Sequence, residues 1–237
     1  MAFLAALSRR ERIPELMDDP GLDPREHRRA LAGLARINRF SGSIAVLWKP
    51  VLRFAREHPA KPLRLLDVAT GSGDVPIGLW QKAKAAGIPL SVEGCDISPT
   101  AIESARSNAE AAGTRANFFD HDVLGEPLPG GFDIVTCSLF LHHLGSDDAL
   151  TLLKRMAAAG SLVLVNDLAR SRFIFLAVWL ACHGLSASPV VRYDGPASVR
   201  SAFSPSEARS SAEQAGLNGA SVRRRFPCRF LLEWRKP

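Results

Sequence analysis

Short apolar runs alternate with longer segments of helical periodicity from residue 63 onward. The apolar runs have the length and composition of buried strands, and the longer segments repeat apolar residues every three or four positions. The predicted strands are 63–68, 90–95, 116–119, 132–138 and 161–166. The predicted helices are 75–86, 100–112 and 147–159. This alternation indicates βαβ units and therefore a parallel sheet.

Two further strands are predicted at the end of the chain, over 221–226 and 229–234. Only Pro227 and Cys228 separate them, and a connection of two residues cannot hold a crossover helix, so these strands must be antiparallel. Between the two groups of strands, 173–185 is predicted as an apolar helix, and Ser204 with Glu207 forms a capping box that begins another. The sequence thus predicts an α/β fold with seven strands.

The first 60 residues follow a different pattern and are predicted to form a helical lid. Turn signals at 19–21 and 23–24 precede a helical pattern over 25–39. We expect 36–43, with Asn38 and Ser41, to close over a ligand, because an amphipathic leader without a strand of its own must cover part of the core. Residues 61–237 would form the second domain.

An insertion over 170–204 is predicted to contribute to a substrate pocket. The helix over 173–185 is apolar on nearly every side, which is typical of a helix between the core and a second surface. Residues 192–195 contain Tyr193, the only tyrosine of the chain, in a predicted turn. Tyr193 is either a substrate contact or part of a surface loop.

Composition narrows the class of protein. The 237 residues are 46% hydrophobic and 23% charged, which are ordinary globular proportions. The four cysteines show neither C-x-x-C spacing nor the density of a disulfide scaffold, which argues against a metal site and favours a cytoplasmic location. No apolar run approaches the roughly 20 residues of a transmembrane helix.

Charge is distributed unevenly along the chain. The formal net charge is +6, yet residues 61–169 carry 13 Asp and Glu against 8 Lys and Arg. Proteins that bind nucleic acid line the site with basic residues, and the sharpest basic cluster here is the short run 223–225. We therefore expect a small-molecule substrate and no nucleic acid.

The strongest chemical signal lies at 65–76, where a strand runs into a glycine-rich turn and then a helix. Gly71 and Gly73 permit a tight turn and close approach of a ligand to the backbone. Pro76 occupies the third glycine position of a dinucleotide-binding sequence. Asp67 at the strand end disfavours a pyrophosphate and suits a ligand that carries a positive amino group or sulfonium.

Two more acidic residues follow strands on the same side of the predicted sheet. Asp96 ends the strand over 90–95, 25 residues after Gly71, where a carboxylate accepts hydrogen bonds from ribose hydroxyls. Asp122 follows the strand over 116–119 and could accept a hydrogen bond from an exocyclic amine such as that of adenine.

These residues resemble the class I S-adenosylmethionine-dependent methyltransferases, and the resemblance covers about Leu63 to Asp167. It implies a Rossmann-like sheet of seven strands, mostly parallel, whose last strand is antiparallel. It implies S-adenosylmethionine as cofactor, with Asp67 and the glycine turn around the methionine part, Asp96 on the ribose and Asp122 on the adenine. The implied cofactor residues are Asp67, Thr70, Gly71, Ser72, Gly73, Asp96, Ile97, Asp122, Val123 and Ser138. The turn at 156–161 departs from the family pattern without touching these positions.

Candidate catalytic residues follow the fourth and fifth predicted strands. His142 and His143 follow the fourth strand, and neutral imidazole is available near physiological pH to take a proton from a hydroxyl. Asp167, at the end of the fifth strand, could orient an imidazole, bind substrate or cap the next element. Either histidine could be the base, and both could instead be structural.

The sequence favours an O-methyltransferase acting on a small, largely apolar metabolite, phenolic or polyketide-like, as in natural-product biosynthesis. The Asn/Asp-Pro-Pro-Tyr/Phe sequence of amino-group methyltransferases is absent after the fourth strand, and Cys137 within that strand is predicted to be core. The resemblance of 67–74 to ubiquinone and menaquinone C-methyltransferases keeps a quinone-like ring as an alternative. A non-catalytic cofactor-binding scaffold is a further alternative, and a homodimer is possible.

Overall fold

The computed structural model describes residues 7, 9–18, 21–23, 25–26, 29, 42–59 and 61–237. A single seven-stranded sheet organises this part of the chain, with strand order β3-β2-β1-β4-β5-β7-β6. The strands are β1 (Leu63–Val68), β2 (Leu90–Asp96), β3 (Asn117–Asp120), β4 (Phe132–Ser138), β5 (Gly160–Leu168), β6 (Ser221–Arg225) and β7 (Arg229–Arg235). Only β7 runs against its neighbours β5 and β6, which confirms the predicted mostly parallel sheet.

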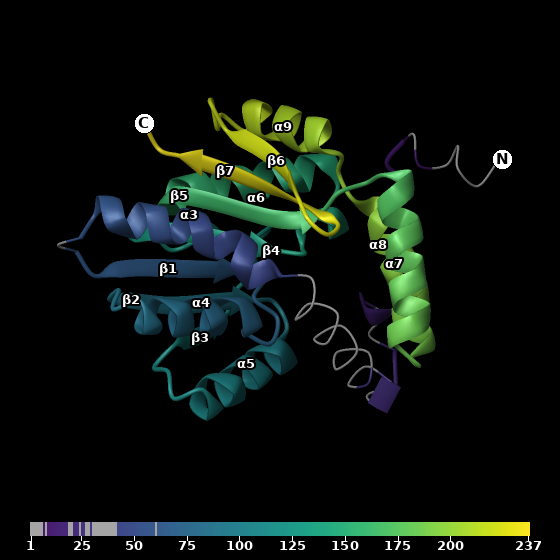
Figure 1. Ribbon diagram of the computed structural model, residues 1–237, viewed down its shortest axis with the longest axis horizontal. Helices are drawn as coiled ribbons and strands as arrows, with labels where there is room; N and C mark the ends of the chain where they lie inside the picture. The colour runs from purple at the N-terminus through teal and green to yellow at the C-terminus, as the bar shows by residue number, and fades with distance from the viewer. Residues whose placement is uncertain are drawn as a thin grey trace.

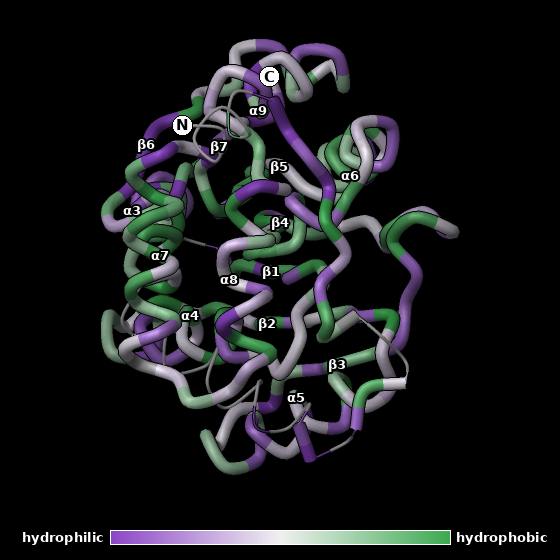
Figure 2. Tube along the Cα trace, turned by 90° about the vertical axis from the view of Figure 1, so that its right-hand side faces the viewer, coloured by the Kyte–Doolittle hydropathy of each residue, from purple (hydrophilic) through white to green (hydrophobic). Residues whose placement is uncertain are grey.

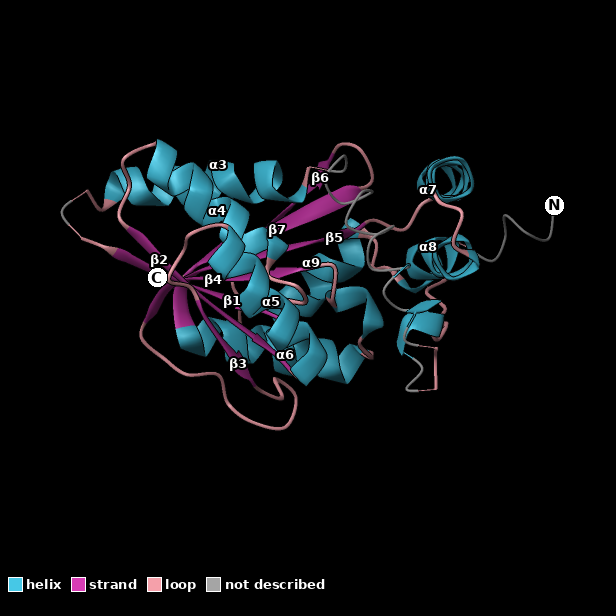
Figure 3. Ribbon diagram, turned by 90° about the horizontal axis from the view of Figure 1, so that it is seen from below, coloured by secondary structure: helices cyan, strands magenta, loops and turns pink. Residues whose placement is uncertain are grey.

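Helices cover both faces of the sheet (Figures 1 and 3). On one side α3 contacts α4, which in turn contacts α5, and on the other side α6 contacts α9. The helical elements are η1 (Leu16–Asp18), α3 (Ser43–Glu57), α4 (Asp74–Ala85), α5 (Pro99–Ala111), η2 (Leu141–His143), α6 (Ser146–Ala159), α7 (Arg172–Leu185), α8 (Pro189–Ser201) and α9 (Pro205–Gln214). Each helix and strand predicted from residue 63 onward is present, with ends shifted by one or two residues. Most of the helical pattern predicted over 25–39 lies outside the described residues.

Burial on both faces explains the near-continuous apolar strands. In β1, Leu65 packs with Leu47 and Leu79 on the side of α3 and α4, while Leu66 packs with Leu152 on the side of α6. Both β1 and β4 show mainly the green of hydrophobic residues in Figure 2. Cys137 in β4 is fully buried, as predicted.

The structure describes two main parts of the predicted lid over 1–60, and they pack in different places. Helix α3 contacts α4, β5 and β7 and is a layer of the sheet domain, because Leu47, Val51 and Phe54 form an apolar stripe that the sheet buries. Residues 9–18 lie along α8 instead. Residues 36–41 of the segment expected to close over a ligand lie outside the described residues.

Helix α8 corrects one prediction, because the expected turn at 192–195 lies inside it. Tertiary contacts override the weak helix propensity of Asp194 and Gly195. The Asp194 carboxylate is buried and accepts hydrogen bonds from the Leu16 and Met17 backbone N–H groups. A β-carbon at Gly195 would lie 2.3 Å from the Cys182 sulfur of α7, so glycine permits α7 and α8 to pack closely.

Helices α7 and α8 lie beyond the carboxyl ends of the parallel strands (Figure 1). The outer side of α7 exposes Phe173, Leu176 and Leu180, so this helix is not enclosed on every side by the described residues. Among those residues, no helix combines the length and apolarity needed to cross a membrane. The predicted homodimer stays a prediction.

Candidate functional site

The glycine-rich turn between β1 and α4 leaves its backbone open on one side. Gly71 and Gly73 have φ of +54° and +75°, in the left-handed region that favours glycine. A β-carbon at Gly71 would meet nothing within 4 Å, whereas one at Gly73 would lie 2.9 Å from the Phe118 ring. Gly73 is thus required by packing, and Gly71 presents bare backbone to the carboxyl edge of the sheet. Ser72 between them donates a hydrogen bond to Asp74.

Asp67 lies beneath this turn rather than on its surface. Its carboxylate accepts hydrogen bonds from the Thr70 hydroxyl at 2.9 Å and the Thr136 hydroxyl at 2.5 Å. Burial raises the pKa of Asp67 to about 7, although the two hydroxyls oppose this shift and Asp96 adds to it. A cation bound nearby would favour the ionised form of this carboxyl.

The raised pKa of Asp67 has a measurable consequence for stability. Since the folded-state pKa is about 7 and the ordinary value is 3.8, the folded protein binds more protons between these values, and the contribution of Asp67 falls as pH rises from about 4 to about 7. The loss amounts to several kcal/mol, at about 1.4 kcal/mol per pKa unit. Urea unfolding at pH 4.5 and pH 7.5 should show this slope in the wild type and a flatter one in Asp67→Asn. Asp120→Asn, at an exposed carboxyl, should keep the wild-type slope; equal slopes in all three proteins would contradict the shift.

Asp96 ties the end of β2 to the glycine turn. One carboxylate oxygen accepts a hydrogen bond from the Gly71 backbone N–H at 2.9 Å, and the other accepts from the Ser98 N–H at 3.0 Å. The structure therefore brings Asp96 and Gly71 together, as the sequence suggested. Ile97 follows with 68% of its surface exposed, which places an apolar side chain at this edge.

Asp122 lies two residues beyond the end of β3. Its exposed carboxylate accepts a hydrogen bond from the Leu124 N–H at 2.9 Å, and the N–H groups of Leu124 and Gly125 lower its pKa. Val123 is buried. The His121 N–H donates to the Asp96 carbonyl, so the segment that carries Asp122 runs beside Asp96.

Ser138 ends β4 at a strained point of the chain. Its hydroxyl accepts a hydrogen bond from the Asn166 side chain at 3.0 Å. The next residue, Leu139, has φ of +57°, which is uncommon for a residue with a β-carbon and clusters at functional sites. The turn redirects the chain into η2, which carries both histidines.

His142 and Asp167 are in direct contact. The His142 Nδ1 atom lies 2.7 Å from one Asp167 carboxylate oxygen, and the other oxygen accepts from the His142 backbone N–H at 2.9 Å. Both side chains are buried. The sequence had left open whether Asp167 would orient an imidazole, and this contact holds the ring of His142 in place. His143 is half-buried, and its ring centre lies 4.3 Å from that of His142.

A residue that the sequence did not single out, Glu15, completes this cluster. One of its carboxylate oxygens lies 3.5 Å from His142 Nε2, and its side chain is 9% exposed. The Ser198 hydroxyl of α8 donates a hydrogen bond to Glu15. No local pattern distinguishes Glu15 from the other acidic residues of its segment, because its partner lies 127 positions away.

The two carboxylates determine the charge of His142. Burial lowers the pKa of the imidazole, but Asp167 and Glu15 outweigh burial and raise it to about 10. Burial also raises the pKa values of Glu15 and Asp167, and His142 lowers both below their usual range. The raised pKa favours the protonated form of His142 between two carboxylates, whereas the sequence analysis considered a neutral imidazole as the base.

The same cluster has the residue types of a metal site. Atoms of Glu15, His142 and His143 that could bind a metal lie within 4.8 Å of one another. We assign no metal to it, because the raised pKa of His142 favours the protonated imidazole, and a protonated ring nitrogen cannot bind a metal.

Residues 10–16 are fixed over the cluster by contacts along their length. The Arg10 guanidinium donates to the backbone carbonyls of His142 at 3.1 Å and Leu144 at 2.5 Å. The Ile13 N–H donates to the Ser201 hydroxyl at 2.9 Å. Arg10 and Glu15 thus hold this segment against His142. The predicted closure of residues 36–43 over a ligand stays a prediction.

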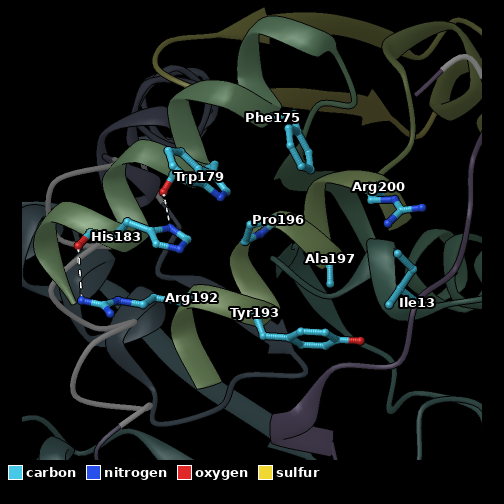
Figure 4. A pocket seen from close by; sticks show the side chains of 9 residues that line it. All are labelled: Ile13, Phe175, Trp179, His183, Arg192, Tyr193, Pro196, Ala197 and Arg200. Carbon is cyan, nitrogen blue, oxygen red and sulfur yellow. Dashed lines mark hydrogen bonds between the residues drawn. The ribbon is translucent and has the colours of Figure 1, made fainter. Parts of the chain in front are cut away.

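A cavity of about 290 Å³ lies between α7 and α8. Its wall contains Phe175 and Trp179 of α7, Tyr193 and Ala197 of α8, and Ile13 (Figure 4). Neither His142 nor Glu15 is among the residues that line this cavity. Most of its lining comes from the insertion over 170–204, and none of the predicted cofactor residues lines it. That this insertion contributes to a substrate pocket stays a prediction.

The chain is similar to known methyltransferases. A family model described as a methyltransferase domain matches residues 65–160. A ubiquinone biosynthesis O-methyltransferase from Bordetella bronchiseptica is 30% identical over 210 residues, which cover 80% of this chain and 82% of that protein. A demethylmenaquinone methyltransferase from Thermus thermophilus is 38% identical over 108 residues, which cover 45% of this chain and 47% of that protein.

A solved structure has the same fold. Magnesium protoporphyrin IX methyltransferase from Synechocystis, with bound S-adenosylhomocysteine, aligns with a TM-score of 0.59 at 18% identity. The alignment covers 93% of this chain and 91% of that chain.

Proposed function

The chain belongs to the class I S-adenosylmethionine-dependent methyltransferases, and on this basis we propose that it transfers the methyl group to a hydroxyl of a small, largely apolar metabolite of phenolic or polyketide-like structure. The observation that carries this proposal is the buried contact of 2.7 Å between His142 and Asp167. His142 follows β4 and Asp167 lies near the end of β5, at the strand edge that also carries the glycine turn and Asp96. An acceptor oxygen can thus approach a methyl group held at this edge.

In this proposal the cofactor lies along the ends of β1 to β4. Gly71 and its turn receive the methionine part, where the buried Asp67 favours positive charge. Asp96 receives the ribose hydroxyls, while the exposed Ile97 and Asp122 lie against the adenine. The full proposed set is Asp67, Thr70, Gly71, Ser72, Gly73, Asp96, Ile97, Asp122, Val123 and Ser138.

We assign His143 the role of base, because His142 is already protonated at neutral pH. The acceptor hydroxyl gives its proton to His143, and its oxygen attacks the methyl carbon as the carbon–sulfur bond breaks. The bond pair goes to sulfur, which leaves S-adenosylhomocysteine. Asp167 keeps His142 charged and oriented, so that the imidazolium stabilises negative charge on the acceptor oxygen.

A second candidate is methylation at a ring carbon of a quinone-like acceptor. The similarity to a demethylmenaquinone methyltransferase favours it. An ionised ring hydroxyl next to His142 would raise the electron density at the adjacent ring carbons. The same site residues would then assist attack by a ring carbon, instead of a hydroxyl oxygen, on the methyl group.

Labelled cofactor tests both candidates. The purified full chain is incubated with methyl-labelled S-adenosylmethionine and a panel of phenols, catechols, quinols, aliphatic alcohols and amines. We expect label on a hydroxyl oxygen of an aromatic acceptor, identified by mass spectrometry and NMR. Label on a ring carbon would favour the second candidate. Label only on amines, or no cofactor binding by calorimetry, would contradict both, and the latter would favour a scaffold.

A substitution tests the proposed ribose contact. Asp96→Ala should weaken binding of S-adenosylhomocysteine by an amount on the order of 1.5–3 kcal/mol, typical of a lost charged acceptor. Asp120, its register partner on β3, is a matched control, and Asp120→Ala should bind normally. Calorimetry gives both affinities, and circular dichroism checks that each variant folds. Unchanged affinity in folded Asp96→Ala would remove the ribose assignment.

A further inference from the structure

The two carboxylates on His142 are held in different ways. Asp167 lies within β5, and its oxygens accept from the backbone N–H groups of His142 and Leu168. Glu15 lies in a segment without regular structure just before η1, and one of its oxygens lies 3.5 Å from Nε2. Asp167 is therefore a built-in partner of the ring, whereas Glu15 can leave Nε2 without any change in the sheet.

The position of Glu15 is the one that an acceptor oxygen needs. Nε2 is the ring nitrogen not engaged by Asp167. The Glu15 oxygen beside it is an anion 3.5 Å away, and both side chains are at least nine-tenths buried. A phenolate oxygen has the same charge and accepts hydrogen bonds in the same way, so it fits the same place on a protonated ring.

We propose that the Glu15 carboxylate occupies the acceptor's place on His142, and that the acceptor oxygen displaces it as an anion. The site then selects hydroxyls that ionise readily, namely phenols and enols, over aliphatic alcohols. This inference rests on the proposed function for the identity of the ligand as a methyl acceptor.

In the proposed reaction, every proton, charge and bonding electron pair has a defined destination. The acceptor hydroxyl loses its proton to His143 or to solvent, and the oxyanion pairs with the His142 Nε2–H group while Glu15 moves into water. The oxygen–carbon bond forms, the carbon–sulfur bond breaks, and sulfur keeps the pair. The neutral ether has no charge to hold it on the imidazolium, so Glu15 can return as the product leaves.

The groups around His142 support a stable positive charge on the ring. Asp167 of β5 stays in place when Glu15 leaves. Arg10 binds the His142 carbonyl, and Arg229 of β7 interacts electrostatically with Asp167. His143 lies beside the ring, and Ser198 of α8 donates to Glu15. Asp167 still raises the pKa of the imidazole after Glu15 has moved, and the incoming oxyanion takes over the negative charge of Glu15 beside the ring.

Binding of 4-nitrophenol tests this proposal without methyl transfer, because its absorbance distinguishes the phenolate from the phenol. The full chain is saturated with S-adenosylhomocysteine and titrated one pH unit below the pKa of free 4-nitrophenol. We expect the bound probe to show the phenolate spectrum, and 4-nitrobenzyl alcohol to compete poorly. Glu15→Gln should bind the phenolate more tightly, on the order of tenfold, because the displaced group no longer carries charge.

Two variants make the result specific. Glu11 lies on the same segment as Glu15 and forms an ion pair with Arg200 of α8. Glu11→Gln removes this ion pair and should leave the affinity for 4-nitrophenol unchanged. Ser198→Ala loosens Glu15 without removing it and should tighten binding to a smaller extent, which keeps the test open if Glu15→Gln does not fold. A probe bound as neutral phenol, or equal affinities in the wild type and both site variants, would overturn the inference. Phenolate binding without turnover of any phenol would overturn the proposed function alone.

Discussion

Removal of residues 1–40 is expected to abolish turnover while leaving cofactor binding within about threefold of the wild type. The deletion takes away Arg10, Ile13 and Glu15, so that His142 loses its cover and the acceptor side of the site opens to water. Water screens the imidazolium and weakens its interaction with an acceptor oxyanion. The proposed cofactor residues all lie after residue 60 and should be unaffected. Product formation and calorimetry with S-adenosylhomocysteine measure the two effects separately.

The deletion and Glu15→Gln should have opposite consequences for an acceptor. The point variant removes a competitor and keeps the cover, whereas the deletion removes both. Full activity in the shortened chain would show that the segment is not part of the site. Loss of cofactor affinity to the same extent as turnover would instead indicate a general structural role.

His143→Ala is expected to lower kcat by about 10²- to 10⁴-fold, the usual contribution of a positioned base. The loss should be largest for weakly acidic hydroxyls and smallest for acidic phenols, which ionise unaided. Affinity for S-adenosylhomocysteine should not change, because His143 lies after β4 on the acceptor side. Steady-state kinetics over a series of phenols of different acidity provides the measurement.

His58→Ala is the matched control, since His58 follows α3 and stacks on Phe54 away from the site. It should retain wild-type kcat. If His143→Ala also retains it across pH 6 to 9 for every phenol, His143 is structural, and the enzyme acts by positioning an acceptor that has already lost its proton.

The order and type of the elements could be predicted from the sequence because their causes are local. Strands β1 to β5 are apolar runs of strand length, and the caps at Ser98 and Ser204 mark helix starts through contacts within three residues. The pairing of β6 with β7 followed from a connection too short for a crossover. Asp96 and the glycine turn met as expected, because carboxyl ends of neighbouring parallel strands lie at one edge.

For the contact between His142 and Asp167, the sequence predicted the positions of the two residues but not the contact itself. The sequence put the two residues at the ends of neighbouring strands, and it left the role of Asp167 open. Only the positive φ of Leu139 and the tight turn after it aim the ring at the carboxylate. The orientation of this short turn depends on the packing around it and not on its local sequence.

Three features were decided by tertiary structure alone. Helix α8 forms through Asp194 and Gly195 because packing against α7 and residues 16–17 outweighs their poor helix propensity. Glu15 reaches His142 across 127 positions of sequence, and no local pattern encodes such a contact. The charge of His142 follows from that contact, because burial alone lowers the pKa of an imidazole and only two carboxylates placed by the fold raise it to about 10. The sequence by itself thus determined the sheet and the meeting of Asp96 with the glycine turn at its carboxyl edge, while the fold decided which carboxylates surround His142.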